Sequence, residues 1–210
     1  MKKKIKVFVI SDHPYSPSGV GIQTRYMIES MLETGDFSFV CFGGAIKHND
    51  YKPQKFEKYG DDLVVFPVNG YGSQDAVRSI IRTEKPDMLW FMTDPRFFPW
   101  LWEIEDEIRS LIPMVYYHVW DNYPYPMYNR PYYESNDVIA TISKVTSDIV
   151  QNVAPNTKEI YVPHAVDHEI FQRRGPEEVI PFRAAFDEHH GSQGKLLFFW
   201  NNRNARRKQS

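Results

Sequence analysis

Short apolar runs alternate along the chain with stretches in which apolar residues recur every three or four positions. The runs have the length of β-strands, and the stretches between them have the period of amphipathic helices. This alternation is typical of βα units whose helices cover the two faces of a parallel sheet. We therefore predict an α/β fold, a Rossmann-like doubly wound parallel sheet. The predicted strands are Ile5–Ile10, Phe37–Phe42, Leu63–Phe66, Met88–Met92, Met114–Tyr117, Val138–Thr141, Glu159–Val162 and Leu196–Trp200.

The helical pattern is clearest in three segments, Ile22–Met31, Ala76–Ile81 and Val145–Val153. Ser73 and Ser143 precede the second and third segments at positions where N-cap residues are expected. A serine there accepts a hydrogen bond from a free backbone N–H of the first turn. The pattern thus predicts both the helices and their starts.

Two irregular stretches complete this picture. Residues 43–61 show little apolar periodicity and predict a long loop. After Phe171, a run of Arg, Gly and Pro at 173–176 interrupts the alternation, and a short helical pattern and one last apolar run follow. We predict two parts: an N-terminal domain over residues 1–175, and over residues 176–210 the incomplete start of a second domain.

Composition excludes several classes of protein. The 210 residues carry 25 Lys plus Arg and 27 Asp plus Glu, a net charge of −2, so we expect no nucleic-acid partner. The content of 42% hydrophobic residues indicates a folded chain. Cys41 is the single cysteine and is expected in the core. The first apolar run is too short for a signal peptide or a transmembrane segment, which predicts a cytoplasmic protein.

Polar residues follow several of the predicted strands. In doubly wound sheets, ligands bind beyond the carboxyl ends of the strands. Substrate-binding candidates there are the carboxylates of Asp12, Asp94 and Asp121 and the helix-opening turn at Gly19 and Gly21, where the backbone can approach a ligand closely.

His118 follows the fifth predicted strand and is the candidate catalytic residue. The alternative is a histidine with a purely structural role. Its neighbours, Trp120 to Tyr125, combine aromatic rings with a carboxylate, a composition suited to binding sugars.

Several familiar sites are absent from the sequence. Thr24 occupies the place of the third glycine of a dinucleotide-binding fingerprint, and Gly43-Gly44 ends the second strand without an acidic residue, which disfavours NAD. There is no P-loop motif. We also expect no metal site, because no Cys-x-x-Cys or His-Glu-x-x-His spacing supports the histidines.

Four stretches, in order, resemble one large family: the retaining, nucleotide-sugar-dependent glycosyltransferases of GT-B architecture. This group includes glycogen synthases, sucrose-phosphate synthases and many mannosyltransferases, and its members have two facing Rossmann-like domains. The stretches are the opening strand, glycine loop and helix (Val7–Leu32), the histidine-bearing loop (Tyr116–Pro124), the serine-initiated helix with the Pro-x-x-Val-Asp segment (Ile142–Phe171), and the final strand with its basic loop (Leu196–Ser210).

The resemblance implies roles for individual residues. Arg203 and Lys208, spaced as in the family's Gly-Arg-x-x-x-x-Lys-Gly pattern, would bind the donor diphosphate, although Asn202 stands where that pattern has Gly. His118 would lie at the transferred sugar, and Gly19 and Gly21 near the acceptor and the donor phosphate.

The resemblance also implies a reaction. A hexose would pass from a nucleotide diphosphate sugar to a hydroxyl acceptor with retention, and no cofactor is needed. The family's nucleotide pocket and its two glutamates seven residues apart would lie beyond Ser210, so we expect little activity from this chain alone. A second polypeptide could supply the donor domain. Alternatives are a non-catalytic binding module, one half of a split enzyme, or another GT-B enzyme such as a sugar-nucleotide epimerase.

Overall fold

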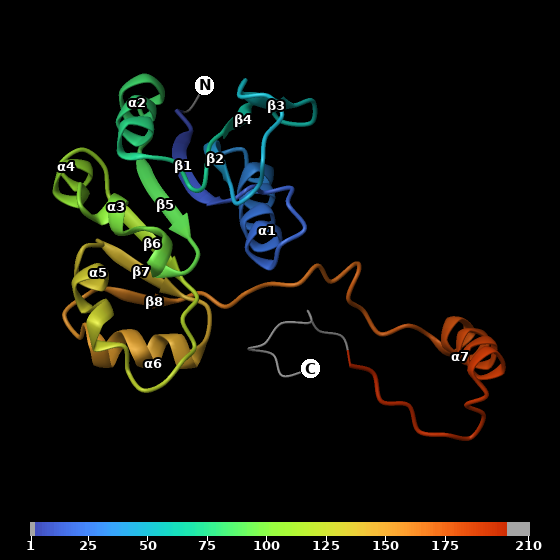
Figure 1. Ribbon diagram of the computed structural model, residues 1–210. Coiled ribbons are helices and arrows are strands. Elements are labelled where there is room, and N and C mark those ends of the chain that lie inside the picture. The colour runs from blue at the N-terminus through green and yellow to red at the C-terminus, as the bar shows by residue number, and fades with distance from the viewer. Residues whose placement is uncertain (1–2, 201–210) are drawn as a thin grey trace. The chain divides into compact units, whose positions relative to one another are not determined.

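The computed structural model describes residues 3–200, and its contacts divide the chain into two units at Ala165 and Val166. The first unit is built on an eight-stranded sheet with the order β3-β4-β2-β1-β5-β6-β7-β8 (Figure 1). The strands are β1 (Ile5–Asp12), β2 (Phe37–Gly44), β3 (Gln54–Phe56), β4 (Gly60–Pro67), β5 (Met88–Met92), β6 (Met114–His118), β7 (Val138–Thr141) and β8 (Glu159–Tyr161).

Seven of these strands run parallel, and only β3 is antiparallel to its neighbour β4. From β1 the chain moves outward through β2 and β4 and then returns to β5 on the other side of β1. This order is that of a doubly wound sheet and confirms the predicted α/β, Rossmann-like fold. The reversal places a topological switch point between β1 and β5.

The helices follow the predicted pattern where it was clear. Ser73 and Ser143 accept hydrogen bonds from the N–H groups of Ala76 and Thr146 and cap α2 and α6, as predicted. The short helices between β5 and β7 were not predicted. The helices are α1 (Gly19–Glu33), α2 (Gln74–Glu84), α3 (Pro99–Trp102), α4 (Glu105–Arg109), α5 (Arg130–Glu134) and α6 (Lys144–Val153), with 3-10 turns η1 (Pro95–Phe97) and η2 (Met127–Asn129).

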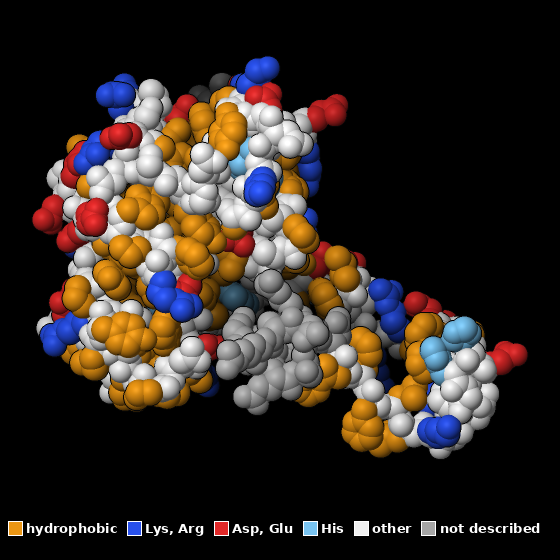
Figure 2. Space-filling view, viewed as in Figure 1, with side chains coloured by type: hydrophobic (Ala, Val, Ile, Leu, Met, Phe, Trp, Pro, Cys, Tyr) orange, Lys and Arg blue, Asp and Glu red, His pale blue; other side chains and the backbone are white. Residues whose placement is uncertain are grey.

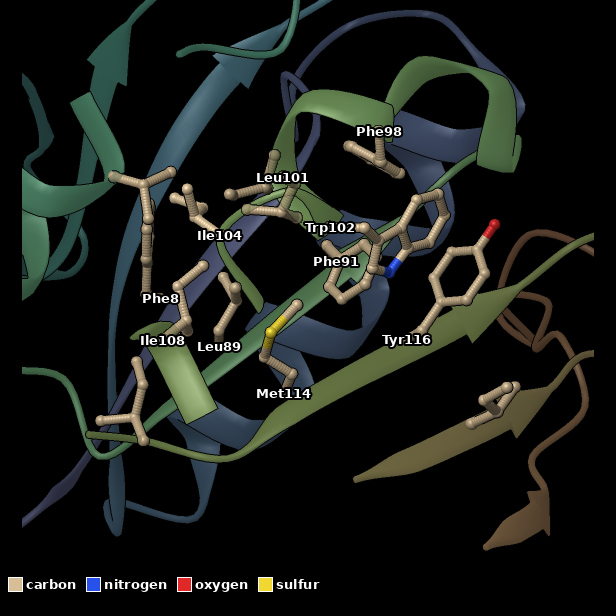
Figure 3. Packing of buried hydrophobic residues seen from close by; sticks show 14 of the residues in the cluster. Phe8, Leu89, Phe91, Phe98, Leu101, Trp102, Ile104, Ile108, Met114 and Tyr116 are labelled. Atoms are coloured by element: carbon tan, nitrogen blue, oxygen red, sulfur yellow. The ribbon is translucent and has the colours of Figure 1, made fainter. Parts of the chain in front are cut away.

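Alternate residues of the strands supply two separate hydrophobic cores. Phe8 and Phe91 belong to the core that includes buried side chains of α2 to α6, and Figure 3 shows Phe91 packed with Phe98, Trp102 and Tyr116. On the opposite face, Val7, Cys41 and Trp90 share a core with Ile28 of α1. Both sheet faces are therefore apolar, as expected for parallel strands.

An apolar groove of about 530 Å3 remains on the face that carries α1. The helices that follow β4 to β7 pack on the other face, so among the helices of residues 3–165 only α1 packs on this one. The groove is lined by side chains of α1, of β5 to β8 and of the segment after β8, including Tyr26, Met27, Met31, Trp90, Val115, Tyr117, Ala140, Ile160 and Val162.

Two sequence predictions need correction. The predicted loop over residues 43–61 contains β3, which pairs with β4 to form an antiparallel hairpin. The predicted strand Leu196–Trp200 is wrong: these residues form no regular structure, and Phe198 and Phe199 are about nine-tenths exposed. A strand requires a hydrogen-bonded neighbour, and the described part of the chain provides none for this segment.

The second unit contains α7 (Pro176–His190), which confirms the helical pattern expected after residue 176. Gly191 ends this helix with φ of +59°, a left-handed conformation that glycine adopts without strain. Val179, Ile180 and Phe182 are exposed on α7. The predicted boundary at residue 175 stays a prediction.

Candidate functional site

The candidate site lies at the carboxyl edge of the sheet, around the switch point between β1 and β5. Because the strands are parallel, the residues that end β1, β5 and β6 share this edge. Asp12 is the last residue of β1 and His118 the last residue of β6. Asp94 follows β5 by two residues, and Gly19 and Gly21 lie in the first turn of α1. The structure therefore brings these five residues to one edge.

Asp12 is buried and binds two hydroxyl groups. The Tyr71 hydroxyl donates to its Oδ1 at 2.7 Å, and the Ser18 hydroxyl donates to its Oδ2 at 2.5 Å. The Ser18 Oγ also accepts from the N–H of Gly21 at 2.9 Å and caps α1. Burial and the adjacent carboxylate raise the pKa of Tyr71, so its hydroxyl stays protonated. Asp12 thus fixes the glycine turn rather than acting as a free base.

The two glycines of the turn meet different surroundings. A Cβ at Gly21 would lie 2.3 Å from Ser16 Oγ and 2.7 Å from the carbonyl oxygen of His13. A Cβ at Gly19 would meet nothing within 4 Å. Gly21 is required for close packing of the loop on α1, whereas Gly19 faces open space and leaves room for a ligand.

Asp94 forms a bidentate ion pair with Arg96. The Arg96 Nε and Nη2 atoms lie 2.8 and 2.6 Å from its two carboxylate oxygens, and the Arg96 N–H donates to Oδ1 at 3.0 Å. Burial opposes ionisation of Asp94, but these hydrogen bonds and the positive charge hold its pKa below the ordinary value. Thr93, just before it, adopts φ of +152°, a costly conformation for a β-branched residue and one typical of functional edges.

His118 is fully buried and neutral. Its Nε2 atom lies 2.6 Å from the Tyr133 hydroxyl, which also receives a hydrogen bond of 3.4 Å from Asn129 Nδ2. Burial lowers the pKa of His118 to about 3, and the negative charge of Asp94 offsets only part of this effect. The Nδ1 atom is also buried and has no hydrogen-bond partner among residues 3–200. Such an atom is costly unless a bound group supplies a partner.

The remaining candidates differ in what the structure says of them. Asp121 follows β6 on an exposed loop, where it makes no hydrogen bond or ion pair with another described residue. Arg203 and Lys208, predicted to bind the donor diphosphate, lie outside the described residues. The roles assigned to all the site residues stay predictions. Cys41 is buried in β2, as predicted, and burial raises the pKa of its thiol.

Sequence reasoning missed four side chains that organise this edge. Ser18 carried a usable signal, because a serine directly before a helix-opening glycine is a typical N-cap. Arg96 stands two residues after Asp94, a spacing that permits a local ion pair. Tyr71 and Tyr133 carried no such signal, since their partners lie 59 and 15 residues away along the chain.

Neither a metal-binding cluster nor a membrane-spanning helix is found among the described residues. Within 3–200, no three His, Cys, Asp or Glu side chains gather as a metal ion would require. None of the described helices has the length and apolar character needed to cross a bilayer. Figure 2 shows acidic and basic side chains interspersed over the visible face of the first unit.

Comparison with known proteins relates this chain to others by fold. No family model matches the sequence, and no curated protein matches it. Among solved structures, the chain is similar to a sucrose-phosphate synthase structure from Thermosynechococcus elongatus, with 11% sequence identity and a TM-score of 0.56. The match covers 88% of this chain and 99% of that chain. At this identity the similarity establishes a shared fold only, that of a Rossmann-like α/β domain.

Proposed function

We propose that this chain is the acceptor-side half of a retaining GT-B glycosyltransferase, followed by the start of the donor domain. The complete enzyme would transfer a hexose from a nucleotide diphosphate sugar to a hydroxyl acceptor in the cytoplasm, without a further cofactor. The observation that carries this proposal is the fold shared with a sucrose-phosphate synthase structure over 88% of the chain. The proposal is also supported by the position of five residues at the carboxyl edge of the sheet: Asp12, Gly19, Gly21, Asp94 and His118.

The edge has the properties of a binding surface for sugar hydroxyls. His118 is neutral, and its pKa of about 3 makes it a poor base near neutral pH, so its contribution is a hydrogen bond. Nδ1 is the ring nitrogen without a partner among residues 3–200, because Nε2 is engaged by Tyr133, and a sugar hydroxyl would reach it by displacing the atoms that bury it. We assign this atom to a hydroxyl of the transferred sugar. Gly19, with open space beside it, is assigned to the approach of the acceptor or of the donor phosphate.

A single sheet edge is one wall of a cleft. Stabilising a transition state requires groups on both sides of the reacting bond, held in a fixed geometry. We infer that activity requires a donor domain, carried by a continuous chain or by a second polypeptide. A binding module without catalysis, or another GT-B enzyme such as a sugar-nucleotide epimerase, would use the same edge and is separated from the proposal by the experiment below.

The test restores a donor domain from a related enzyme by fusion or co-expression and measures binding of nucleotide diphosphate sugars by calorimetry. Arg203→Ala and Lys208→Ala should each weaken donor binding by about 1.5–3 kcal/mol, the usual size of a charge-assisted hydrogen bond. Arg206→Ala, in the same basic segment, is the matched control and should leave donor affinity unchanged.

His118→Ala should lower turnover more than donor affinity, since its assigned contact is with the sugar and not with the phosphates. Equal donor affinity in the wild type and in the Arg203→Ala and Lys208→Ala variants would contradict the proposed diphosphate site. Donor binding without transfer to any hydroxyl acceptor would favour the binding module, and conversion of the free donor sugar would favour the epimerase.

A further inference from the structure

Three aromatic side chains and one arginine lie on the loops that follow β5 and β6 and are here called the aromatic strip: Arg96, Phe97, Trp120 and Tyr128. The guanidinium carbon of Arg96 lies 5.9 Å from the centre of the Trp120 ring. Tyr128 meets the same ring edge-on, with centroids 6.1 Å apart. Phe97 is the next residue after Arg96 and contacts the ring of Tyr71 at 5.2 Å. The strip therefore lies at the same sheet edge as Asp94 and His118.

We propose that this aromatic strip binds the sugar rings of an oligosaccharide acceptor. The inference rests on the proposed function and names the acceptor class of that site. Phe97 is 50% exposed and Tyr128 is 67% exposed, so both present aromatic surface to a ligand. Aromatic faces pack against the C–H groups of a pyranose ring, and nearby polar groups fix the orientation of its hydroxyls.

Contacts beneath the strip hold it in place before a ligand arrives. Trp120 packs against the hydrophobic core, and its Nε1 donates to the carbonyl oxygen of Asn122 at 3.1 Å. Arg96 is fixed by its two hydrogen bonds to the Asp94 carboxylate. Side chains that are ordered before binding lose little conformational entropy when a ligand arrives. Binding is then favourable even for a ligand that makes few contacts.

Polar groups for hydroxyls lie along the same strip. The Arg96 side chain is 76% exposed, and a guanidinium keeps N–H donors beyond the two that Asp94 engages. The exposed Asp121 carboxylate follows Trp120 directly and can accept hydrogen bonds from hydroxyl groups. Hydrogen-bond donors and acceptors thus lie on the same two loops as the aromatic rings.

This chemistry suits a glycan better than a nucleic acid or a protein partner. Nucleic acids are held by cations that neutralise phosphates, whereas the charge of Arg96 is paired with Asp94 and Asp121 adds a negative charge. Stable protein interfaces bury about 800 Å2 on each partner. Four side chains in a narrow strip offer much less than that area.

The test is an array of immobilised oligosaccharides probed with the full chain, with no donor present. We expect binding to a subset of the glycans, and at least tenfold weaker binding by the double variant Phe97→Ala/Tyr128→Ala. The double variant Phe97→Tyr/Tyr128→Phe keeps both rings and should retain binding. Leu111→Ala changes a side chain that is also largely exposed but precedes β6 at the opposite edge, and should have no effect.

Three results would overturn the inference. The first is an array on which no glycan is bound above background, and the second is equal glycan binding by the wild type and by the alanine double variant. The third is that the alanine double variant loses binding to single-stranded polyuridylate but keeps its binding to glycans. If glycan binding depends on the strip but the chain supplied with a donor domain transfers no sugar, only the proposed function is contradicted. If sugar is transferred but acceptor binding does not depend on the strip, only the role proposed for the strip is contradicted.

Discussion

Burial and a single hydrogen bond determine the chemistry of His118. The imidazole lies beneath the carboxyl edge with Tyr133 on one nitrogen, and its pKa of about 3 keeps it uncharged. Asp12 and Asp94 are held in a similar way, by hydroxyl groups and by Arg96 respectively. At the scale of single residues, the edge therefore offers fixed hydrogen-bonding groups and few free charges. Such groups donate or accept hydrogen bonds in a fixed direction.

We predict that His118 makes the first unit sensitive to acid. An unfolded histidine titrates near pH ~6.5, so between that pH and about 3 the unfolded state binds a proton that the folded state does not. The free energy of unfolding should thus fall as the pH decreases from about 6.5, by up to about 1.4 kcal/mol per pH unit from this residue. Burial also lowers the pKa values of His13 and His164, which act in the same direction.

Urea unfolding of the wild type and of His118→Gln, between pH 7.5 and 4.5, measures this effect. Because glutamine does not titrate, the variant should lose less stability per pH unit than the wild type, whatever its stability at pH 7.5. The same pH dependence in both proteins would show that His118 binds its proton equally well in the folded and unfolded states.

At the scale of elements, α1 is joined to β1 by a loop that tolerates little change. Ser18 caps the helix and binds Asp12, and Gly21 packs against Ser16 and His13. The start of α1 is therefore fixed relative to the end of β1, which holds the glycine turn in place at the candidate edge.

The paired glycines of α1 give a matched test. Gly21→Ala should destabilise the protein by about 1–3 kcal/mol, because its Cβ would overlap Ser16 Oγ and the carbonyl oxygen of His13. Gly19→Ala meets open space in a helical turn and should leave stability unchanged or raise it by up to about 1 kcal/mol. Thermal unfolding of both variants checks this, and equal effects would contradict the packing of the loop.

Elements with a strong local pattern could be predicted from the sequence, and those that depend on distant partners could not. Each of the first seven predicted strands is present: six contain buried apolar residues, and β8 is a largely exposed edge strand. β3 has the sequence Gln-Lys-Phe, which shows no strand pattern and is ordered only by pairing with β4. The short α3 and α4 lack several turns of periodicity. At the site, the ends of the strands could be located, but not the tyrosines that reach them from other loops.

At the scale of the whole molecule, two features bear on the proposed donor domain. Under the proposed function the carboxyl edge would form one wall of a cleft, and the segment Leu196–Trp200 is an apolar run without a neighbouring strand in the described chain. In a complete GT-B enzyme, a second sheet would give this segment its partners.

We predict that the chain associates through Leu196–Trp200 as its concentration rises. Phe198, Phe199 and Trp200 are 91%, 90% and 75% exposed, and a contiguous run of exposed apolar side chains favours association with another chain. Phe198→Glu/Phe199→Glu adds charge to this segment and should yield a monomer. Sedimentation velocity across a hundredfold range of concentration compares the variant with the wild type.

Leu111→Glu is the control and should leave association unchanged, since Leu111 is 64% exposed but its neighbours in sequence are the polar Ser110 and the buried Ile112. A monomeric wild type over the whole range would contradict the prediction. Association that survives the double glutamate substitution would assign it to a different surface, such as the apolar groove beside α1. Supplying a donor domain should suppress association in the wild type, because the segment would then pair within its own sheet.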